Sequence, residues 1–202
     1  MITLNLQSSI ATAKERLRSA LESQEFFRAM AQGVARLIRG HLALLDATRK
    51  NALGGKRSHF YAAAAKSLYV EAEEGGSAVT IPAVGFRQRY EGGPILPVVS
   101  KWLTIPATAE AYGRRAREFD DIEFAIIGGK PALVRKEDQG SVDFISGKVI
   151  PKAKRKKAAV LFWLRKSVFQ QADPTVMPSD LEMEAAAVFG GEAYLASLKG
   201  AA

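Results

Sequence analysis

The chain has 202 residues, of which 48% are hydrophobic and 25% are charged, a balance typical of a folded globular protein. It contains no cysteine, which excludes disulfides, thiol nucleophiles and thiolate metal sites, and no apolar run approaches the roughly 20 residues that span a bilayer. The net charge is +8, which either directs the protein to nucleic acid, anionic membranes or acidic partner surfaces, or serves only its solubility.

The first fifty residues are predicted to be helical. Apolar side chains recur there at steps of three and four, which places them on one side of a helix. They are Phe27, Met30, Val34, Leu37, Ile38, Leu42 and Leu45, and His41 lies on the same stripe. Residues 11–21 form either an earlier helix or the start of the same one. Asn51 and the pair Gly54-Gly55 end it, and Ser58 is the expected N-cap of a short helix that follows.

The middle of the chain is predicted to consist mostly of antiparallel strands. Short β-type runs flank Gly75-Gly76, and a second pair of runs flanks Gly128-Gly129, so each pair predicts a hairpin. The run 85–97, GFRQRYEGGPILP, is broken by glycines and prolines and is interpreted as a turn between two strands. Residues 158–170 contain a nearly continuous run of apolar side chains, which predicts a central strand. Every glycine pair in the chain is expected to be a tight turn with positive φ.

A last helix is predicted from Leu181 to Leu198, with Ser179 or Asp180 as its N-cap. Its pair Gly190-Gly191 lowers helical stability and is expected to mark a kink. The order of helix, strands and helix predicts an α+β fold, with a long N-terminal helix packed on a mostly antiparallel β-sheet and a C-terminal helix. We expect one domain over residues 1–202, made of a helical segment 1–50, a β-rich core 51–178 and a closing helix 179–202.

A search for catalytic chemistry finds no convincing site. His41 and His59 do not have the spacing of metal ligands, and no nucleophile elbow is present. The densest acidic group is Glu118, Asp120, Asp121 and Glu123, which could bind a divalent ion but is better interpreted as a solvated turn. We therefore predict no catalytic, metal-binding or cofactor-binding residue and a protein that is not an enzyme.

A basic tract is the strongest local feature, because six cations lie between residues 148 and 157. They are Lys148, Lys152, Lys154, Arg155, Lys156 and Lys157. Such a cluster could neutralise several phosphates of a nucleic acid and make binding depend strongly on salt. It contains no aromatic side chain for stacking on bases, so a self-repelling solvated loop and a contact for an acidic neighbouring subunit stand beside that interpretation.

Residues 89–106, RYEGGPILPVVSKWLTIP, resemble the central signature of phage virion morphogenesis proteins, the tail-completion or head–tail connector family. The signature is carried by Tyr90, Gly92, Gly93, Ile95, Pro97, Lys101, Leu103, Ile105 and Pro106. Segments on either side are also similar, so the resemblance covers residues 42–198. Two features depart from the family: the late loop reads Asp173-Pro174-Thr175 where many relatives have Arg-Pro-Phe, and the basic tract is heavier.

The resemblance implies a non-enzymatic subunit without cofactors that forms rings where the capsid joins the tail. Its partners would be further copies of itself and other phage head or tail proteins, with possible non-specific DNA contact and no membrane. It would be found in the virion, and in the cytoplasm of the bacterial host during assembly. Phe26 and Phe27 agree with assembly, because they give the long helix more apolar surface than one stripe needs.

The alternatives are a nucleic-acid-binding module that uses the basic tract and, far behind it, an enzyme built on the acidic group. The candidates for an interface or for DNA contact are Arg87, Arg89, Tyr90, Lys152, Lys154, Arg155, Lys156 and Lys157.

Overall fold

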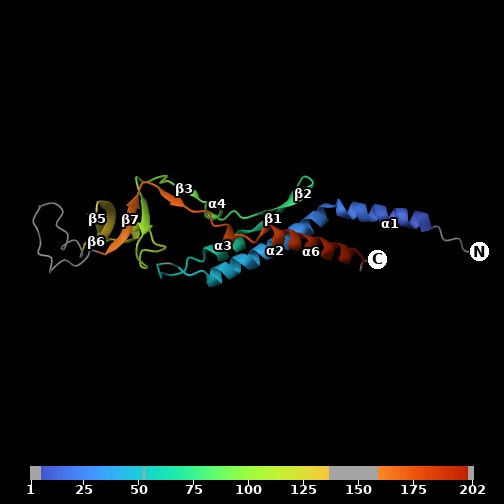
Figure 1. Cartoon of the computed structure of the whole chain (residues 1–202), viewed down its shortest axis with the longest axis horizontal. Helices are drawn as coiled ribbons and strands as arrows, with labels where there is room; N and C mark the ends of the chain where they lie inside the picture. The colour runs from blue at the N-terminus through green and yellow to red at the C-terminus, as the bar shows by residue number, and fades with distance from the viewer. Residues whose placement is uncertain (1–5, 52, 137–158, 200–202) are drawn as a thin grey trace, which may run out of the picture. The chain divides into compact units, whose positions relative to one another are not determined.

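The computed structural model describes residues 6–51, 53–136 and 159–199. The sequence predicts one domain over residues 1–202, and the contacts within the chain separate it into two compact units (Figure 1). Unit 1 contains the described residues of segments 1–48, 59–91 and 172–202, and unit 2 those of 49–58 and 92–171. The segments of the two units therefore alternate along the chain.

The helical N-terminal segment is two helices, α1 (Leu6–Leu21) and α2 (Gln24–Thr48). Ser23 separates them, because its hydroxyl donates to the Ala20 carbonyl (2.7 Å) at the end of α1 and accepts from the Phe26 N–H (3.2 Å) at the beginning of α2. A serine that accepts from the third residue of a helix is an N-cap. The sequence left open whether residues 11–21 belong to a separate helix, and this cap accounts for the separate helix observed.

The C-terminal helix α6 (Asp180–Lys199) lies antiparallel to α2, as Figure 1 shows. At one end the rings of Phe26 and Tyr194 are 6.2 Å apart, and further along Gly33 approaches the backbone of Ala186. A Cβ atom built on Gly190 would lie 2.4 Å from the carbonyl oxygen of Ala29, so the two backbones nearly touch. The predicted turn with positive φ at Gly190-Gly191 is wrong, because the pair lies within one uninterrupted helix, where it allows this close approach.

A β-hairpin packs on α2 in unit 1. It is formed by β1 (Tyr69–Glu73) and β2 (Gly76–Thr80), antiparallel and joined through Gly75 with φ 70°, as the sequence predicted. The Gln24 side chain at the beginning of α2 donates to the Gly76 carbonyl (2.7 Å) and fixes the tip. The core between hairpin and helices contains Ile38, Leu42, Tyr61, Leu68, Phe86 and Val176.

The short helix α3 (Phe60–Ser67) begins without the N-cap that the sequence suggested. Ser58 does not cap it. His59 occupies the N-cap position with φ 50°, a left-handed conformation that is uncommon for a residue with a Cβ. The cap is supplied by Asp46 on α2, whose carboxylate accepts from His59 Nδ1 (2.8 Å) and from the Ala62 N–H (3.2 Å). The prediction failed because the capping group comes from another helix.

Unit 2 contains a four-stranded antiparallel sheet in the order β4-β7-β6-β5. Its strands are β4 (Leu103–Pro106), β5 (Ile122–Ile127), β6 (Lys130–Arg135) and β7 (Val160–Arg165). The predicted central strand is β7, and β5 and β6 form the predicted hairpin through Gly128-Gly129. Phe162 packs against Phe119 and Ala111 from the loop that follows β4. A small ladder joins β3 (Gly93–Ile95) to β8 (Val168–Gln170).

The stretch around Gly92-Gly93 was expected to turn one strand into the next. The residues before it are helical, however, and form α4 (Phe86–Glu91). Gly85 begins this turn of helix with φ 82°, and its carbonyl accepts from the Arg89 N–H (2.9 Å). Gly92 and Gly93 then have φ 73° and 112°, so the pair turns a helix into strand β3. The predicted α+β class, with helices at both ends and antiparallel sheets between them, is confirmed.

Candidate functional site

The outer side of α6 carries large apolar side chains that the described part of the chain leaves exposed. Leu181, Val188 and Phe189 are 76%, 55% and 68% exposed. Their spacing of seven and eight residues places them on one side of the helix. The helix is fixed at its beginning by a reciprocal capping box, in which the Glu182 carboxylate accepts from the Ser179 N–H (2.8 Å) and the Glu182 N–H donates to the Ser179 hydroxyl (3.3 Å). The Ser179 hydroxyl also donates to this carboxylate (2.7 Å), and the hydrogen bonds that the carboxylate accepts from the Ser179 hydroxyl and N–H lower the pKa of Glu182.

Toward α2 the same helix presents small residues. Gly190 and Gly191 are buried there, and a Cβ atom on Gly191 would lie 2.9 Å from the ring of Phe26. The extra apolar surface that Phe26 gives to α2 is therefore covered by α6. Met183 and Tyr194 of α6 also point inward, but Leu181, Val188 and Phe189 point outward, whereas a helix that serves only its own core turns its large apolar side chains inward. This outer face of α6, defined by Leu181, Val188 and Phe189, is a candidate interface.

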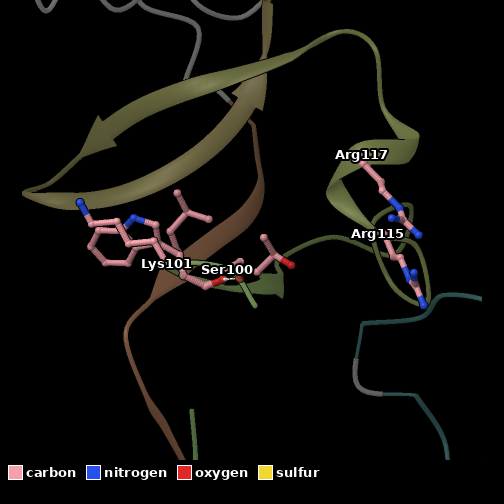
Figure 2. A pocket seen from close by; sticks show the side chains of 7 residues that line it. Ser100, Lys101, Arg115 and Arg117 are labelled. Carbon is pink, nitrogen blue, oxygen red and sulfur yellow. Dashed lines mark hydrogen bonds between the residues drawn. The ribbon is translucent and has the colours of Figure 1, made fainter. Parts of the chain in front are cut away.

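A basic cleft of about 540 Å³ lies in unit 2 (Figure 2). The cations Lys101, Arg115 and Arg117 line it together with Ser100, Trp102, Thr104 and Leu164. Figure 2 shows Lys101 and Ser100 beside the sheet, while Arg115 and Arg117 lie on a separate segment. That segment contains the 3₁₀ turn η1 (Ala116–Glu118), which follows the loop after β4.

Every ionisable side chain that lines this basic cleft is a cation. A further cation lies beside it, because Lys166 Nζ stands 5.7 Å from the centre of the Trp102 ring. Lysine over an indole is a cation–π contact, which leaves the lysine charge in place. The arrangement attracts anions, and an aromatic side chain, Trp102, beside the cations suits a ligand with both phosphates and rings. In the sequence, Lys101 is singled out only as part of the signature over residues 89–106. Nothing near Arg115 or Arg117 in the sequence indicates a binding site.

The candidates Arg87, Arg89 and Tyr90 all lie on α4. Arg87 is 87% exposed and pairs with Glu91 (2.8 Å) four residues later. Arg89 is 44% exposed, and its guanidinium lies 3.6 Å from the Asp173 carboxylate. The Asp173 N–H also lies within hydrogen-bonding distance of the Arg89 and Tyr90 carbonyls (3.1 and 3.2 Å). Arg89 thus holds α4 to the residues before the turn η3 (Pro174–Val176), in addition to any role at an interface.

The basic tract lies outside the described residues, between the end of β6 at Arg135 and the beginning of β7 at Val160. This applies to Lys148, Lys152, Lys154, Arg155, Lys156 and Lys157. As candidates for DNA contact they stay predictions.

The acidic group and the histidines have structural partners. Asp121 accepts from Arg135 (2.6 Å), and Glu118 lies 3.7 Å from Arg114. His41 donates from Nε2 to the Thr175 carbonyl (3.0 Å), while His59 binds Asp46. In the described part of the chain, no three acidic or histidine side chains gather in a way that could hold a metal ion.

Comparison with known proteins gave no match to a family model, to a curated protein or to a solved structure. None of the helices described here combines the length and the apolar character that crossing a bilayer requires.

Proposed function

We propose that this chain is a non-enzymatic structural subunit of a phage or prophage virion, acting in tail completion or at the head–tail connector, and that it assembles as a ring of identical copies. The observation that carries the proposal is the outer face of α6, where the described part of the chain leaves Leu181, Val188 and Phe189 exposed, while Gly190 and Gly191 lie against α2. A subunit in a ring meets both neighbours through head-to-tail contacts, so an apolar face that the chain does not cover itself is expected. The resemblance of residues 89–106 supports the virion role.

The apolar face supplies only part of the energy of assembly. Full burial of one such side chain contributes about 1.5–3 kcal/mol. The exposed parts of Leu181, Val188 and Phe189 together equal about two full side chains, so their burial contributes roughly 3–6 kcal/mol. Association costs roughly 4–15 kcal/mol in lost freedom of motion. We therefore expect an oligomer that depends on protein concentration and becomes stable when each subunit contacts two neighbours. Because the contact is apolar, it persists in high salt.

The test is the molar mass in solution, measured by light scattering after size exclusion and by native mass spectrometry. The wild-type chain is expected to form a closed oligomer in high salt, and Phe189→Glu to reduce it to monomers. Val84→Glu is the matched control, because Val84 belongs to the same unit and is 96% exposed. A wild-type chain that stays monomeric at the highest soluble concentration, or a Phe189→Glu oligomer as stable as that of Val84→Glu, contradicts assembly through this face.

The virion role makes a separate prediction about location. The protein is expected in purified particles of its phage, and in the bacterial cytoplasm only while particles assemble. Other head or tail proteins are the expected partners. Deletion of the gene should leave heads and tails that do not join, as seen by electron microscopy. Complete, infectious particles from the deletion strain would contradict the role.

Nucleic-acid binding is the second candidate function, and the basic cleft favours it with an observation of its own. Lys101, Arg115 and Arg117 line that cleft without an acidic neighbour among its lining residues. The affinity for a fluorescent single-stranded oligonucleotide should fall steeply with salt, with a log–log slope of about −0.7 for each phosphate contacted. Lys101→Gln/Arg117→Gln tests the cleft. A separate variant with glutamine at four lysines tests the basic tract; these are Lys152, Lys154, Lys156 and Lys157. Binding that neither variant weakens contradicts this function.

A further inference from the structure

A second basic surface lies in unit 1, in a groove of about 420 Å³ between α2 and β1. The residues that line the groove come from α2 and from the beginning of β1. They are Arg28, Gln32, Arg36, Arg39, Leu68, Tyr69 and Val70. No residue of β2 is among them. A lining that includes β1 but not β2 is what a groove beside the other edge of β1 would have, and that edge pairs with no strand in the described part of the chain. We call this groove the arginine groove.

Three guanidinium groups face this groove without an acidic partner. Arg39 donates to the Leu68 carbonyl (2.9 Å), which shows that an arginine of α2 reaches the backbone at the beginning of β1. Arg36 makes a long contact with the Gln32 carbonyl (3.3 Å) within the helix. Within the described ranges, neither of these two nor Arg28 forms an ion pair. The arginine groove therefore concentrates positive charge that nothing described in the chain neutralises.

The spacing of the cations matches an extended peptide. Arg28, Gln32 and Arg36 follow one another at steps of four residues, which is about 6.0 Å along a helix axis. Alternate side chains of a β-strand point to the same side and are about 6.8 Å apart. A strand lying in the groove would therefore bring two carboxylates four residues apart, about 13.6 Å, opposite Arg28 and Arg36, which are about 12 Å apart along the helix axis, with the side chain between them opposite Gln32. The small mismatch per step is within the reach of an arginine side chain.

The hairpin itself has an unfilled edge that such a strand completes. A two-stranded sheet is only marginally stable by itself and gains from a third strand. The side chains of β1 are mostly exposed, whereas those of β2 are all partly covered. Addition of a strand satisfies the backbone groups of an open edge and leaves specificity to the side chains beside it. Nucleic acid shares the attraction to arginine but offers no pattern of backbone N–H and C=O groups to match this edge.

We propose that the arginine groove binds an acidic extended segment of a partner protein, which adds to β1 as a third strand and places carboxylates four residues apart against Arg28 and Arg36. This inference goes beyond the virion role and does not depend on the outer face of α6. It assigns unit 1 a partner-binding site of its own, of the strand-addition kind, with an acidic segment as its ligand class.

The test is binding of a fluorescein-labelled peptide with alternating glutamate and threonine, followed by fluorescence anisotropy at low salt. Arg28→Gln/Arg36→Gln removes two charges from the groove. Arg16→Gln/Arg18→Gln is the matched control, because it removes two exposed arginines from α1 of the same unit. A second peptide of equal charge, interrupted by prolines, cannot add as a strand. A thymidine oligonucleotide serves as the nucleic-acid probe.

The groove variant is expected to bind the peptide about ten-fold more weakly, which corresponds to about 0.7 kcal/mol for each of the two exposed ion pairs. The control variant should change the affinity less than about two-fold. The proline-interrupted peptide should also bind at least about ten-fold more weakly to the wild-type chain. Equal losses in both variants, equal binding of both peptides, or an oligonucleotide that binds more tightly with the same dependence on Arg28 and Arg36 would each overturn the proposal. Circular dichroism of each variant confirms that it is folded.

Discussion

Replacement of Gly33 by alanine is expected to destabilise the α2–α6 pair, although alanine is the better helix former. A Cβ atom at this position would lie 2.2 Å from the carbonyl oxygen of Ala186 and 3.4 Å from the Cα of Gly190. Carbon and oxygen atoms that are not bonded approach to about 3.3 Å. The obstacle is backbone, which cannot rotate away as a flexible side chain can. The two helices would have to separate by about 1 Å.

The magnitude follows from two opposing effects. Alanine is favoured over glycine in a helix by about 1 kcal/mol. Overpacking of a well-packed contact costs about 1–3 kcal/mol, and a gap of 0.5–1 Å forfeits roughly a quarter to a half of the dispersion energy of the atoms around it. We expect Gly33→Ala to lower the free energy of unfolding by about 1–2 kcal/mol.

Gly40 provides the control, since it lies on the same helix and nothing is within 4 Å of an added Cβ. Gly40→Ala should raise the free energy of unfolding by up to about 1 kcal/mol. Both variants are compared by urea unfolding followed by far-UV circular dichroism. Helical signal is the suitable readout because both tryptophans, Trp102 and Trp163, lie in unit 2. If Gly33→Ala is as stable as Gly40→Ala, the close approach of the two backbones is refuted.

Two further predictions concern helix termini. Asp46→Ala removes the acceptor that His59 Nδ1 and the Ala62 N–H share, and should lower the free energy of unfolding by about 1 kcal/mol in a urea titration; an unchanged midpoint would show that α3 does not need this cap. The pKa of Glu182 is lowered by its hydrogen bonds to Ser179, so its contribution to stability is present above the unfolded pKa and is lost as pH falls through the folded pKa. Ser179→Ala should raise this pKa toward its usual value and flatten that acid dependence, and an NMR titration in which the Glu182 pKa is the same in both proteins would refute it.

Structural features that depend only on a few neighbouring residues were predicted correctly from the sequence. Glycine at a turn is required because it adopts positive φ, and the hairpins at Gly75 and Gly128-Gly129 follow from that local requirement. Ser179 and Glu182 form a cap within three residues, so the beginning of α6 was also predictable. The order of these elements was enough to predict the α+β class.

The sequence failed where a distant segment determines the outcome. A glycine pair at a turn and a glycine pair at a helix crossing look alike in sequence, so Gly190-Gly191 was interpreted as a turn or kink. The cap of α3 comes from Asp46, which lies on another helix, and no rule based on neighbouring residues finds it. The helical turn of α4 was hidden because the glycines and prolines around it indicate loop.

The candidate sites depend even more on tertiary structure. Lys101 and Arg115 line one basic cleft but are separated by a strand and a loop. Arg28 and Arg36 were visible only as arginines off the apolar stripe of α2, and nothing near them in sequence predicted that an open strand edge would lie beside them. Composition predicted a positive charge for the chain but could not show that two separate surfaces concentrate it.

The residues on the inner and outer faces of α6 together indicate that a partner covers the outer face. Close contact with α2 requires small residues at Gly190 and Gly191, so these two positions of the helix cannot hold large apolar side chains. The core of unit 1 is instead formed around Ile38, Leu42 and Tyr61, and Phe189 is not part of it. The large apolar residues on the outer side keep more than half of their surface exposed in the described part of the chain, and that surface favours association. A helix that served only this unit would be as stable with polar residues there, so the outer apolar residues are best explained by a neighbour that covers them.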